Sequence, residues 1–373
     1  MSIGDGFPIE LLNQDVGERI NYFNAFTISH PILKQVYEEL VQSINNPGSK
    51  SFIFVYGPSG VGKTTLFSRL IKRVINDSLE LLENDPGRLP IVGLRAIAPE
   101  TGNFDWKDFY IRSLEACYEP LIKHKVDTTL PKNAPRKKED VARELKRSLE
   151  NTLRYRKPKA FLIDEAQHLT KMASGRKLRD QMDIIKSLAE ESNVLFVLFG
   201  TYELLPFRNL SGQLSRRSAD IHFPRYRINK AEDEQAFFNA LWMLQRHMPF
   251  EEQPDLINNW EFFYLYSIGC IGILKDWLSR TYNANLLSNR FTITLEDFKK
   301  HAFSIDQCHK MVSESIEGEH QLEENEDKRR ELMSLLGLNH QEEMEQQVVR
   351  KTKKAVGLRN PKRDLVGGIE LAE

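Results

Sequence analysis

Cysteine is scarce in this sequence, with three residues in 373: Cys117, Cys270 and Cys308. Because the three are isolated, they form neither a disulfide framework nor a metal-binding pair, and a reducing cytoplasm is the expected compartment. Long apolar runs are missing as well, since none approaches the roughly 20 residues of a membrane-spanning helix. The N-terminus MSIGDGFPIE has no signal-peptide pattern. We therefore expect a cytoplasmic protein without a membrane partner.

Neither sign of charge is in excess, because the chain has 52 Lys and Arg against 53 Asp and Glu, for a net charge of −1. The chain as a whole is thus not an electrostatic nucleic-acid binder, and any such contact must come from a local patch. Hydrophobic residues make up 40% and charged residues 28% of the sequence, which is typical of a globular protein. The length allows one large domain or two to three small ones.

What the sequence does contain is a phosphate-binding motif. The apolar run Phe52–Tyr56 is of strand type, and a helix-compatible segment covers 65–72. Between them the residues fit G-x-x-x-x-G-K-[ST] in a strand–loop–helix context, which separates a phosphate site from a chance glycine-rich turn. The motif and the residue after it are Gly57, Pro58, Ser59, Gly60, Val61, Gly62, Lys63, Thr64 and Thr65.

The chemistry of a triphosphate explains these residues. Gly60 and Gly62 let backbone N–H groups turn toward an anion, and the positive end of the following helix adds to that field. Lys63 would reach the β- and γ-phosphates, and the Thr64 hydroxyl would hold Mg²⁺. The sequence therefore predicts that the chain binds ATP with Mg²⁺.

A second half of the same site is predicted about a hundred residues downstream. The buried-strand pattern Ala160–Asp164 ends in Asp164, and Glu165 follows. Asp164 can hold Mg²⁺ through its waters, and Glu165 is placed to polarise the attacking water. The alternative is an acidic helix cap after a strand. We favour the catalytic interpretation because two independent halves of one site agree.

Thr201 is a candidate for sensing the γ-phosphate. It follows the buried-strand pattern Leu195–Gly200, and capping of the next helix is an equal alternative. Strand patterns occur at 52–56, 91–97, 160–164 and 194–199. Because helical stretches separate them, they predict an α/β fold with a parallel sheet covered on both faces. The ligand is then expected at the carboxyl ends of the strands.

Two arginines, Arg216 and Arg217, stand just before a further short strand predicted at 221–223. In this position an oligomeric ATPase presents an arginine finger to the γ-phosphate of its neighbour. The sequence does not rank the two residues, although we prefer Arg216 as the finger. A surface pair that binds local carboxylates is the alternative.

The composition shifts between residues 132 and 159, where eleven Lys and Arg stand against four Asp and Glu. The local net charge is thus +7 in a chain whose total is −1. This segment is the best candidate for a surface that contacts a phosphate backbone. A solvated helix face is the plainer interpretation of any charge run.

The sequence turns all-helical from Asn229. We divide the chain into an N-terminal segment (1–32), an α/β core (33–228), a helical lid (229–310) and a charged, largely disordered tail for partner binding (311–373). Within the lid, Gly269 and Gly272 open a helix that contains Lys275. Lys275 could reach back to the nucleotide as a second sensor, or it could be an ordinary exposed helix lysine.

These motifs together resemble those of the AAA+ ATPases, within the initiator-type clade. More narrowly, the chain resembles the TnsC/TniB-type transposition regulators, including those of CRISPR-associated transposons. The residues that carry the resemblance are Arg19, His30-Pro31, GPSGVGKTT, FLIDEAQHL, the FGT strand end, QLSRRS and IGCIGILKDWL. The resemblance covers about 20–300, and Lys275 departs from the arginine common at the second sensor of AAA+ proteins.

The resemblance implies a bacterial, cytoplasmic ATPase that forms a homo-oligomeric ring or filament on double-stranded DNA. It would connect a target-selection protein (TniQ/TnsD-like) to the transposase (TnsA/TnsB-like), and ATP hydrolysis, slow and coupled to assembly, would disassemble it. DNA contacts in that family come from loops that here correspond to 99–107 and 132–147. The DNA-binding candidates in these segments are Asn103, Lys132, Arg136, Lys137, Lys138, Arg143, Lys146 and Arg147.

Two other functions remain open at this point. One is an initiator-type loader of a replicative helicase on the same fold, which would normally carry an added C-terminal DNA-binding domain; no such domain is visible after 303. The other is a nucleotide-gated protein scaffold that does not touch DNA, in which the basic run 132–159 is only a solvated helix.

Overall fold

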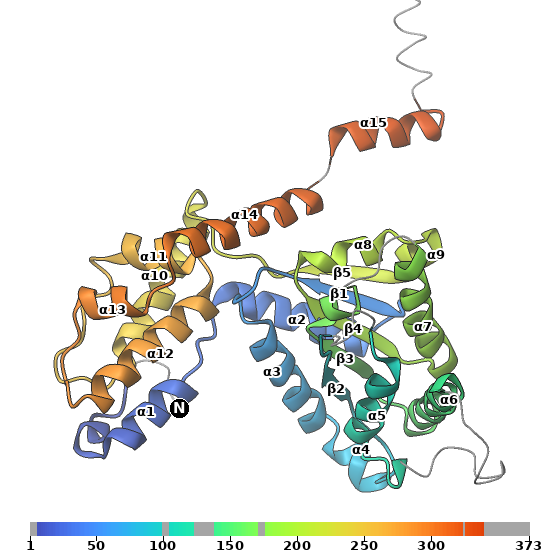
Figure 1. The fold of residues 1–373 in the computed structure, drawn as a ribbon, viewed down its shortest axis with the longest axis horizontal. Helices are drawn as coiled ribbons and strands as arrows, with labels where there is room; N and C mark the ends of the chain where they lie inside the picture. Colours follow the sequence, from blue (N-terminus) through green and yellow to red (C-terminus); the bar gives the residue numbers. More distant parts are fainter. Residues whose placement is uncertain (1–5, 99–103, 123–137, 171–175, 324, 339–373) are drawn as a thin grey trace, which may run out of the picture. The chain divides into compact units, whose positions relative to one another are not determined.

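The computed structural model describes residues 6–98, 104–122, 138–170, 176–323 and 325–338 (Figure 1), and at 138–140, 176 and 177 it describes the backbone alone. By internal contacts the chain divides into two units, residues 1–319 and 320–373. The candidate site lies entirely in the first unit. No helix in the described part of the chain is long and apolar enough to cross a membrane.

The first unit is built on a five-stranded sheet in the order β2-β3-β4-β1-β5, and every pair of neighbouring strands is parallel. The strands are β1 (Phe52–Tyr56), β2 (Val92–Arg95), β3 (Ala160–Asp164), β4 (Leu195–Gly200) and β5 (Ser218–His222). The three interior strands are buried at every position, which is why they are apolar without alternation. The predicted α/β fold with a parallel sheet is confirmed.

The edge strands differ from expectation in their bounds. Strand β2 is shorter than the predicted 91–97, and β5 begins at Ser218 rather than at 221. Register explains β5, because it pairs with β1 from Phe52↔Ser218 through Tyr56↔His222. An edge strand is less covered than an interior strand and can keep an exposed polar residue such as Asp220, so an apolar run marks only part of it.

Helices cover both faces of the sheet (Figure 1). Helices α2 (Pro31–Asn45) and α3 (Lys63–Asn76) lie on one face, where their apolar side chains form one core cluster with the strands. Helices α5 (Trp106–Ala116), α6 (Lys138–Arg156) and α7 (Arg176–Ser192) lie on the other face. The short elements of this part are α4 (Leu79–Asn84), η3 (Ala166–Leu169), η4 (Tyr202–Leu204), α8 (Leu205–Arg208) and α9 (Gly212–Arg216).

Helix α2 begins as its sequence predicts. Pro31 occupies the first turn, where a missing N–H costs nothing. His30 is the N-cap, and its Nδ1 accepts from the Leu33 N–H at 3.3 Å. The same nitrogen lies 2.9 Å from the hydroxyl of Tyr226, so His30 also ties α2 to the segment that leaves β5.

A second core lies in the helices that follow the sheet, the segment predicted to be a lid and called the lid below. It is formed by α10 (Ala231–Arg246), α11 (Trp260–Ser267), α12 (Ile271–Leu287) and α13 (Leu295–His301), together with α1 (Val16–Ala25). Phe23 of α1 is fully buried there against Tyr282. The N-terminal helix, which follows η1 (Ile9–Asn13), thus shares its core with the lid although more than 200 residues separate them.

Helix α14 (Ile305–Leu322) continues past residue 310, where we placed the start of the tail. Its last residues in the first unit are packed, because a Cβ on Gly318 would lie 2.1 Å from the ring of Tyr202. Glu319 is buried, and its carboxylate lies 3.2 Å from Arg225 and 3.5 Å from Arg227. The second unit contains α15 (Glu326–Leu335), and residues 339–373 lie outside the described part.

Candidate functional site

The phosphate-binding loop connects β1 to α3 and needs its glycines for two reasons. Gly62 has a φ of +110°, a conformation that side chains with a Cβ rarely adopt. Gly57 is required by close packing, because a Cβ there would lie 2.3 Å from the carbonyl oxygen of Phe223. The sequence pattern is therefore explained by backbone geometry.

Lys63 lies buried at the first position of α3. Its Nζ donates to the carbonyl oxygens of Gly57 and Pro58, each at 2.8 Å. Burial lowers the pKa of Lys63 to about 8, although the nearby carboxylates of Glu165 and Asp164 act in the opposite direction. A phosphate group would stabilise the charged form of this buried ammonium, which burial disfavours.

Thr64 and Asp164 meet across the site, although 100 residues separate them. The Thr64 hydroxyl donates to Asp164 Oδ2 at 2.9 Å. Burial raises the pKa of Asp164, while hydrogen bonds from Thr64 and from the Glu165 N–H favour its charged form. A divalent cation would favour that form further.

The donor set fits Mg²⁺ rather than a metal held by protein ligands alone. Among the described residues, no group of three or more His, Cys, Asp and Glu is placed to hold a metal ion. Magnesium is commonly bound through one or two protein oxygens, substrate phosphates and waters. The hydroxyl of Thr64 and the carboxylate of Asp164 meet that requirement.

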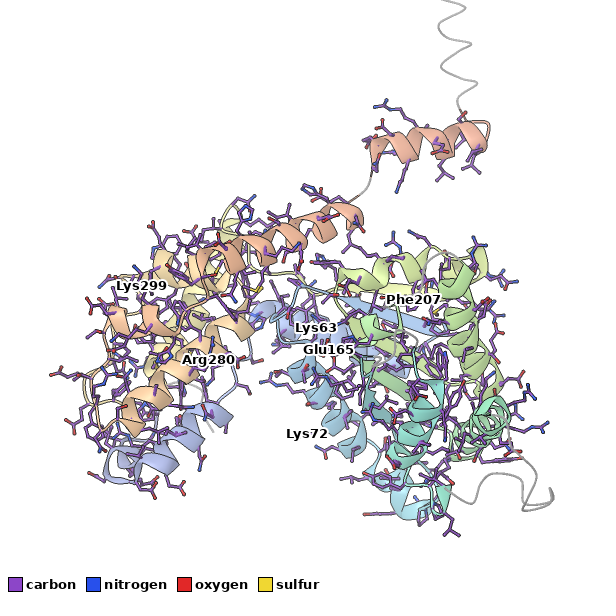
Figure 2. All side chains as sticks on the ribbon, viewed as in Figure 1. Lys63, Lys72, Glu165, Phe207, Arg280 and Lys299 are labelled. Atoms are coloured by element: carbon purple, nitrogen blue, oxygen red, sulfur yellow. The ribbon has the colours of Figure 1, made fainter. Side chains whose placement is uncertain are left out.

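Glu165 follows β3 in a left-handed conformation, with a φ of +53°. Figure 2 shows its side chain beside Lys63, and the two charges interact. Its Oε1 lies 3.7 Å from Nη2 of Arg95, and its Oε2 accepts a hydrogen bond from Nε2 of Gln167 at 2.5 Å. The carboxylate that we assign to water activation is thus held on both oxygens.

Arg95 and Gln167 are the residues of this site that sequence reasoning missed. Arg95 ends β2 and pairs in register with Asp164, so the parallel sheet brings it to the same edge as Glu165. Gln167 directly follows Asp164, Glu165 and Ala166 in the sequence. That position supported the family resemblance without indicating a contact.

Thr201 lies at the end of β4, as predicted. Its N–H donates to Oε1 of Gln167 at 3.3 Å. Its side chain makes no capping hydrogen bond to η4, and its Oγ1 is buried without a hydrogen-bond partner in the described part of the chain. A buried hydroxyl of this kind needs a partner, and the sensor role remains a prediction.

The beginning of α12 packs directly on the phosphate-binding loop. The Ile273 N–H donates to the carbonyl oxygen of Gly60 at 3.2 Å. A Cβ on Gly272 would lie 2.3 Å from the same oxygen, so only glycine allows this approach. The lid therefore contacts the loop through backbone atoms.

Lys275, for which we predicted either a second-sensor role or an ordinary exposed position on the helix, is turned toward α1. Its Nζ donates to the carbonyl oxygen of Phe23 and, at 2.9 Å, to the hydroxyl of Ser279. It also lies 3.6 Å from the centre of the Phe23 ring, and burial lowers the pKa of Lys275 to about 8. These contacts explain its position without a nucleotide, whose contact with Lys275 remains a prediction.

The two arginines before β5 differ in their surroundings. Arg217 pairs with Glu190 at 3.0 Å. Arg216, at the end of α9, is exposed and has no ion-pair partner within the described ranges. Ser218 pairs with Phe52, and the phosphate loop follows Tyr56. The arginines therefore lie at the amino end of the strands, about 13 Å along β1 from the end that carries the phosphate loop.

Most of the DNA-binding candidates lie outside the described residues: Asn103, Lys132, Arg136, Lys137 and the side chain of Lys138. The three that are described stand on α6. Arg143 and Arg147 are exposed four residues apart, so they share one helix face. Lys146 is partly buried, donates to the Ser187 hydroxyl at 2.9 Å and pairs with Glu150 at 3.4 Å.

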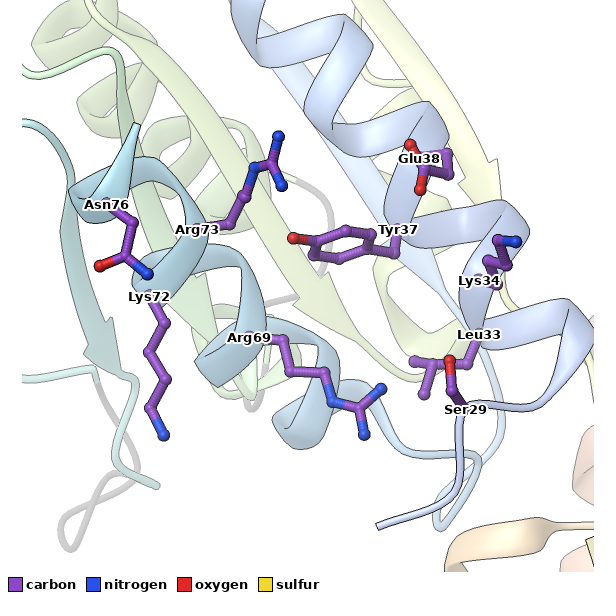
Figure 3. Close-up of a pocket in the computed structure, with 9 residues that line it drawn as sticks. All are labelled: Ser29, Leu33, Lys34, Tyr37, Glu38, Arg69, Lys72, Arg73 and Asn76. Atoms are coloured by element: carbon purple, nitrogen blue, oxygen red, sulfur yellow. The ribbon is translucent and has the colours of Figure 1, made fainter. Parts of the chain in front are cut away.

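A second cationic surface lies between α2 and α3, around a cavity of about 640 Å³ (Figure 3). The cations that line it are Lys34, Arg69, Lys72 and Arg73. Tyr37 extends from α2 toward α3, and Arg69 extends toward Ser29. Arg69 is held by a hydrogen bond to the Thr27 hydroxyl at 2.7 Å, and Arg73 pairs with Asp77 at 2.7 Å.

Comparisons with known proteins agree with this description of the core. Residues 44–207, somewhat less than half of the chain, match the family model described as an AAA domain. No curated protein matches the chain.

Among solved structures, the chain is similar to the Aeropyrum pernix ORC2 protein in its ADPNP-ADP complexes, with 15% identity and a TM-score of 0.47 over 73% of this chain and 68% of that one. It is similar to a Walker-type ATPase of Pyrococcus abyssi, with 16% identity and a TM-score of 0.41 over 80% and 75%. It is also similar to Drosophila ORC bound to DNA, with 11% identity and a TM-score of 0.45 over 77% and 65%. Likeness at this level does not define function. The family match and the five-stranded parallel sheet, four of whose strands lie within residues 44–207, agree on the fold of an AAA domain.

Proposed function

We propose that this chain is an ATPase whose copies assemble on double-stranded DNA and hydrolyse ATP between neighbouring subunits. One observation carries the ATPase proposal. Lys63, Thr64 and Asp164 lie together at the carboxyl edge of the sheet, and Glu165 lies beside them. A cation for the phosphates, two oxygens for Mg²⁺ and a carboxylate for the attacking water are the parts that phosphoryl transfer to water requires.

Each residue has a separate task in this proposal. Lys63 leaves the carbonyl oxygens of its own loop and binds the β- and γ-phosphates. Thr64 and Asp164 hold Mg²⁺, which, when bound, neutralises charge on the phosphate oxygens. Glu165 orients and deprotonates the water that attacks the γ-phosphate.

Arg216 is the residue through which we propose that hydrolysis depends on assembly. Because it precedes β5 at the amino end of the strands while its own phosphate loop lies at their carboxyl end, we infer that it serves the triphosphate of a neighbouring subunit rather than its own. An arginine finger supplied by a neighbour stabilises the charge of the transition state. We therefore infer that hydrolysis is slow in the monomer and is coupled to assembly into a ring or filament.

The proposed DNA contact has two described candidates. One is the exposed face of α6 with Arg143 and Arg147, which belongs to the basic segment found in the sequence. The other is the cationic surface around the cavity between α2 and α3. On that surface Lys72 and Arg69 stand three residues apart on one helix, where like charges repel, and a bound phosphate would offset this repulsion.

Within this class we infer a transposition regulator that connects a target-selection protein to a transposase. The support is the set of motifs shared with the TnsC/TniB-type regulators, from the phosphate loop to the glycine-rich start of α12. The initiator-type helicase loader is the second candidate, because it would use the same nucleotide site. A nucleotide-gated scaffold without DNA contact is the third, and the DNA-binding measurement separates it from the other two.

The test is ATP hydrolysis and DNA binding by the full chain with Mg²⁺, with and without a long duplex of mixed sequence. Hydrolysis that duplex DNA stimulates, that Lys63→Ala abolishes and that Glu165→Gln lowers to a slow residual rate supports the proposal. Hydrolysis at the wild-type rate in the Glu165 variant would refute the assigned base. Wild-type protein that remains monomeric with ATP, Mg²⁺ and DNA would refute the assembly.

The two DNA surfaces are compared by salt dependence. Each phosphate contact that is removed lowers the slope of log affinity against log salt by about 0.9. The Arg143→Ala/Arg147→Ala protein is measured beside Lys34→Ala/Lys72→Ala, with Lys299→Ala/Lys310→Ala on the lid and α14 as the control for charge. The surface whose variant flattens the slope is the one that contacts the duplex.

A further inference from the structure

We infer that Gln167 is a positioning residue for Glu165, and that it links this carboxylate to the strand end that carries Thr201. The inference rests on the proposed ATPase function and extends it. Gln167 touches neither nucleotide nor metal in this proposal. It acts by fixing where the base points.

The geometry uses both ends of the side-chain amide. Nε2 of Gln167 donates to Glu165 Oε2 at 2.5 Å, and Oε1 accepts from the Thr201 N–H at 3.3 Å. The residue is 6% exposed, so water does not compete for these bonds. A buried amide that bridges two chain segments has one satisfied orientation, because exchanging its N and O would place donor against donor and acceptor against acceptor.

Gly200 provides the room for this bridge. A Cβ at this position would lie 2.7 Å from Oε1 of Gln167 and 2.5 Å from Cδ1 of Leu204. The φ of Gly200 does not itself demand glycine. A side chain larger than that of glycine at the end of β4 would therefore have to displace Leu204 or the Gln167 amide.

The bridge leaves Glu165 able to act as a base. Each carboxylate oxygen has two lone pairs, so Oε2 can accept from Gln167 and still accept a proton from water. Arg95 lies 3.7 Å from Oε1. The amide of Gln167 therefore acts on Oε2 while Arg95 lies near Oε1, and the two contacts together direct the carboxylate.

The bridge also couples the base to the predicted sensor. The Thr201 hydroxyl is buried without a described partner, and it belongs to the residue whose N–H meets Gln167. A γ-phosphate that engages this hydroxyl would fix the strand end, and through it the amide and Glu165. Glu165 would then be aligned only when the triphosphate is complete.

The test is Gln167→Met, which keeps the length and packing of the side chain and removes the donor and acceptor. We expect kcat to fall about 10- to 100-fold, the scale of a small misplacement of a catalytic group. The dissociation constant for a fluorescent, slowly hydrolysed ATP analogue should change less than about twofold, because Lys63 and Thr64 are untouched. An unchanged kcat would overturn the inference, and so would a loss confined to nucleotide binding.

A double-mutant cycle separates positioning from structural damage. If Gln167 acts through Glu165, Gln167→Met should cause no further loss in the Glu165→Gln background under single-turnover conditions. An equal loss in both backgrounds would overturn the inference. The matched control is Gln245→Met, which removes a part-buried amide that accepts from Leu256 N–H at 2.8 Å in the lid.

The outcomes distinguish this inference from the proposed function. If wild-type protein hydrolyses ATP, Glu165→Gln hydrolyses it poorly, and Gln167→Met behaves as wild type, the ATPase assignment stands and the role of Gln167 is wrong. If wild-type protein fails to hydrolyse ATP under all conditions of assembly, both are wrong.

Discussion

Ile273 donates its backbone N–H to the carbonyl oxygen of Gly60 at 3.2 Å, which joins the first turn of α12 to the phosphate-binding loop. The contact is direct because residue 272 is glycine and its Cα passes close to the same carbonyl. Movement of the lid and the shape of the loop are therefore mechanically linked. A nucleotide that changes the shape of the loop would shift the position of α12, and a partner that moves α12 would change the affinity of the loop for nucleotide.

The first prediction concerns this contact. Gly272→Ala places a Cβ 2.3 Å from the Gly60 oxygen, so α12 or the loop must shift, at a cost of about 1–3 kcal/mol in unfolding free energy. We expect weaker ATP binding and a lower melting temperature, measured by titration calorimetry and by thermal unfolding. Gly212→Ala is the control, since its Cβ would meet nothing within 4 Å. Equal behaviour of the two variants would contradict the proposed link.

The second prediction concerns the charge of Lys63. Burial lowers its pKa to about 8 in this structure, and only the ammonium form attracts phosphate. Between pH 7 and pH 9 the ammonium fraction falls about tenfold, so ATP affinity should fall by about the same factor. Titration at several pH values checks this, and proton uptake on binding near pH 8 should accompany it. Affinity that is flat over this range would show that Lys63 stays charged without the nucleotide.

The third prediction concerns His30. Burial lowers its pKa to about 4, below the unfolded value of about 6.5. The unfolded chain therefore binds the additional proton between these values, and stability falls as the pH drops from 6.5 toward 4. His30→Asn keeps an N-cap acceptor for α2 and removes this titration.

The measurement for His30 is the unfolding free energy as a function of pH. We expect the acid slope of the variant to be shallower by up to about 1.4 kcal/mol per pH unit. His222, whose pKa burial also lowers to about 4, remains in both proteins and contributes equally. An unchanged slope would mean that the pKa of His30 is the same in the folded and unfolded states.

Much of the core was predictable because its signals are local. The strands β1, β3 and β4 are uninterrupted apolar runs, and the phosphate motif occupies one loop. The meeting of Thr64 with Asp164 followed from parallel topology alone, since all strands end at the same edge.

The missed features depend on contacts between distant segments. Lys275 is oriented by Phe23, which lies 252 residues earlier in the chain, and no local pattern encodes that contact. Glu319 is buried by Arg225 and Arg227, so a polar stretch that looked like a tail continues as helix α14. The bridge from Gln167 to Thr201 joins the ends of two neighbouring strands, and the pattern gave the strands without the side-chain geometry.

The last prediction separates Arg216 from Arg217. Arg217→Ala breaks an exposed pair with Glu190, which contributes at most about 1 kcal/mol, so DNA-stimulated hydrolysis should stay near the wild-type rate. Arg216→Ala removes the proposed finger and should lower that rate about 10³-fold or more. Mixing Arg216→Ala protein with Lys63→Ala protein should restore part of the activity, because some interfaces then combine an intact loop with an intact arginine. No recovery in the mixture, at concentrations where both proteins assemble, would place the arginine and the phosphate loop in separate functions.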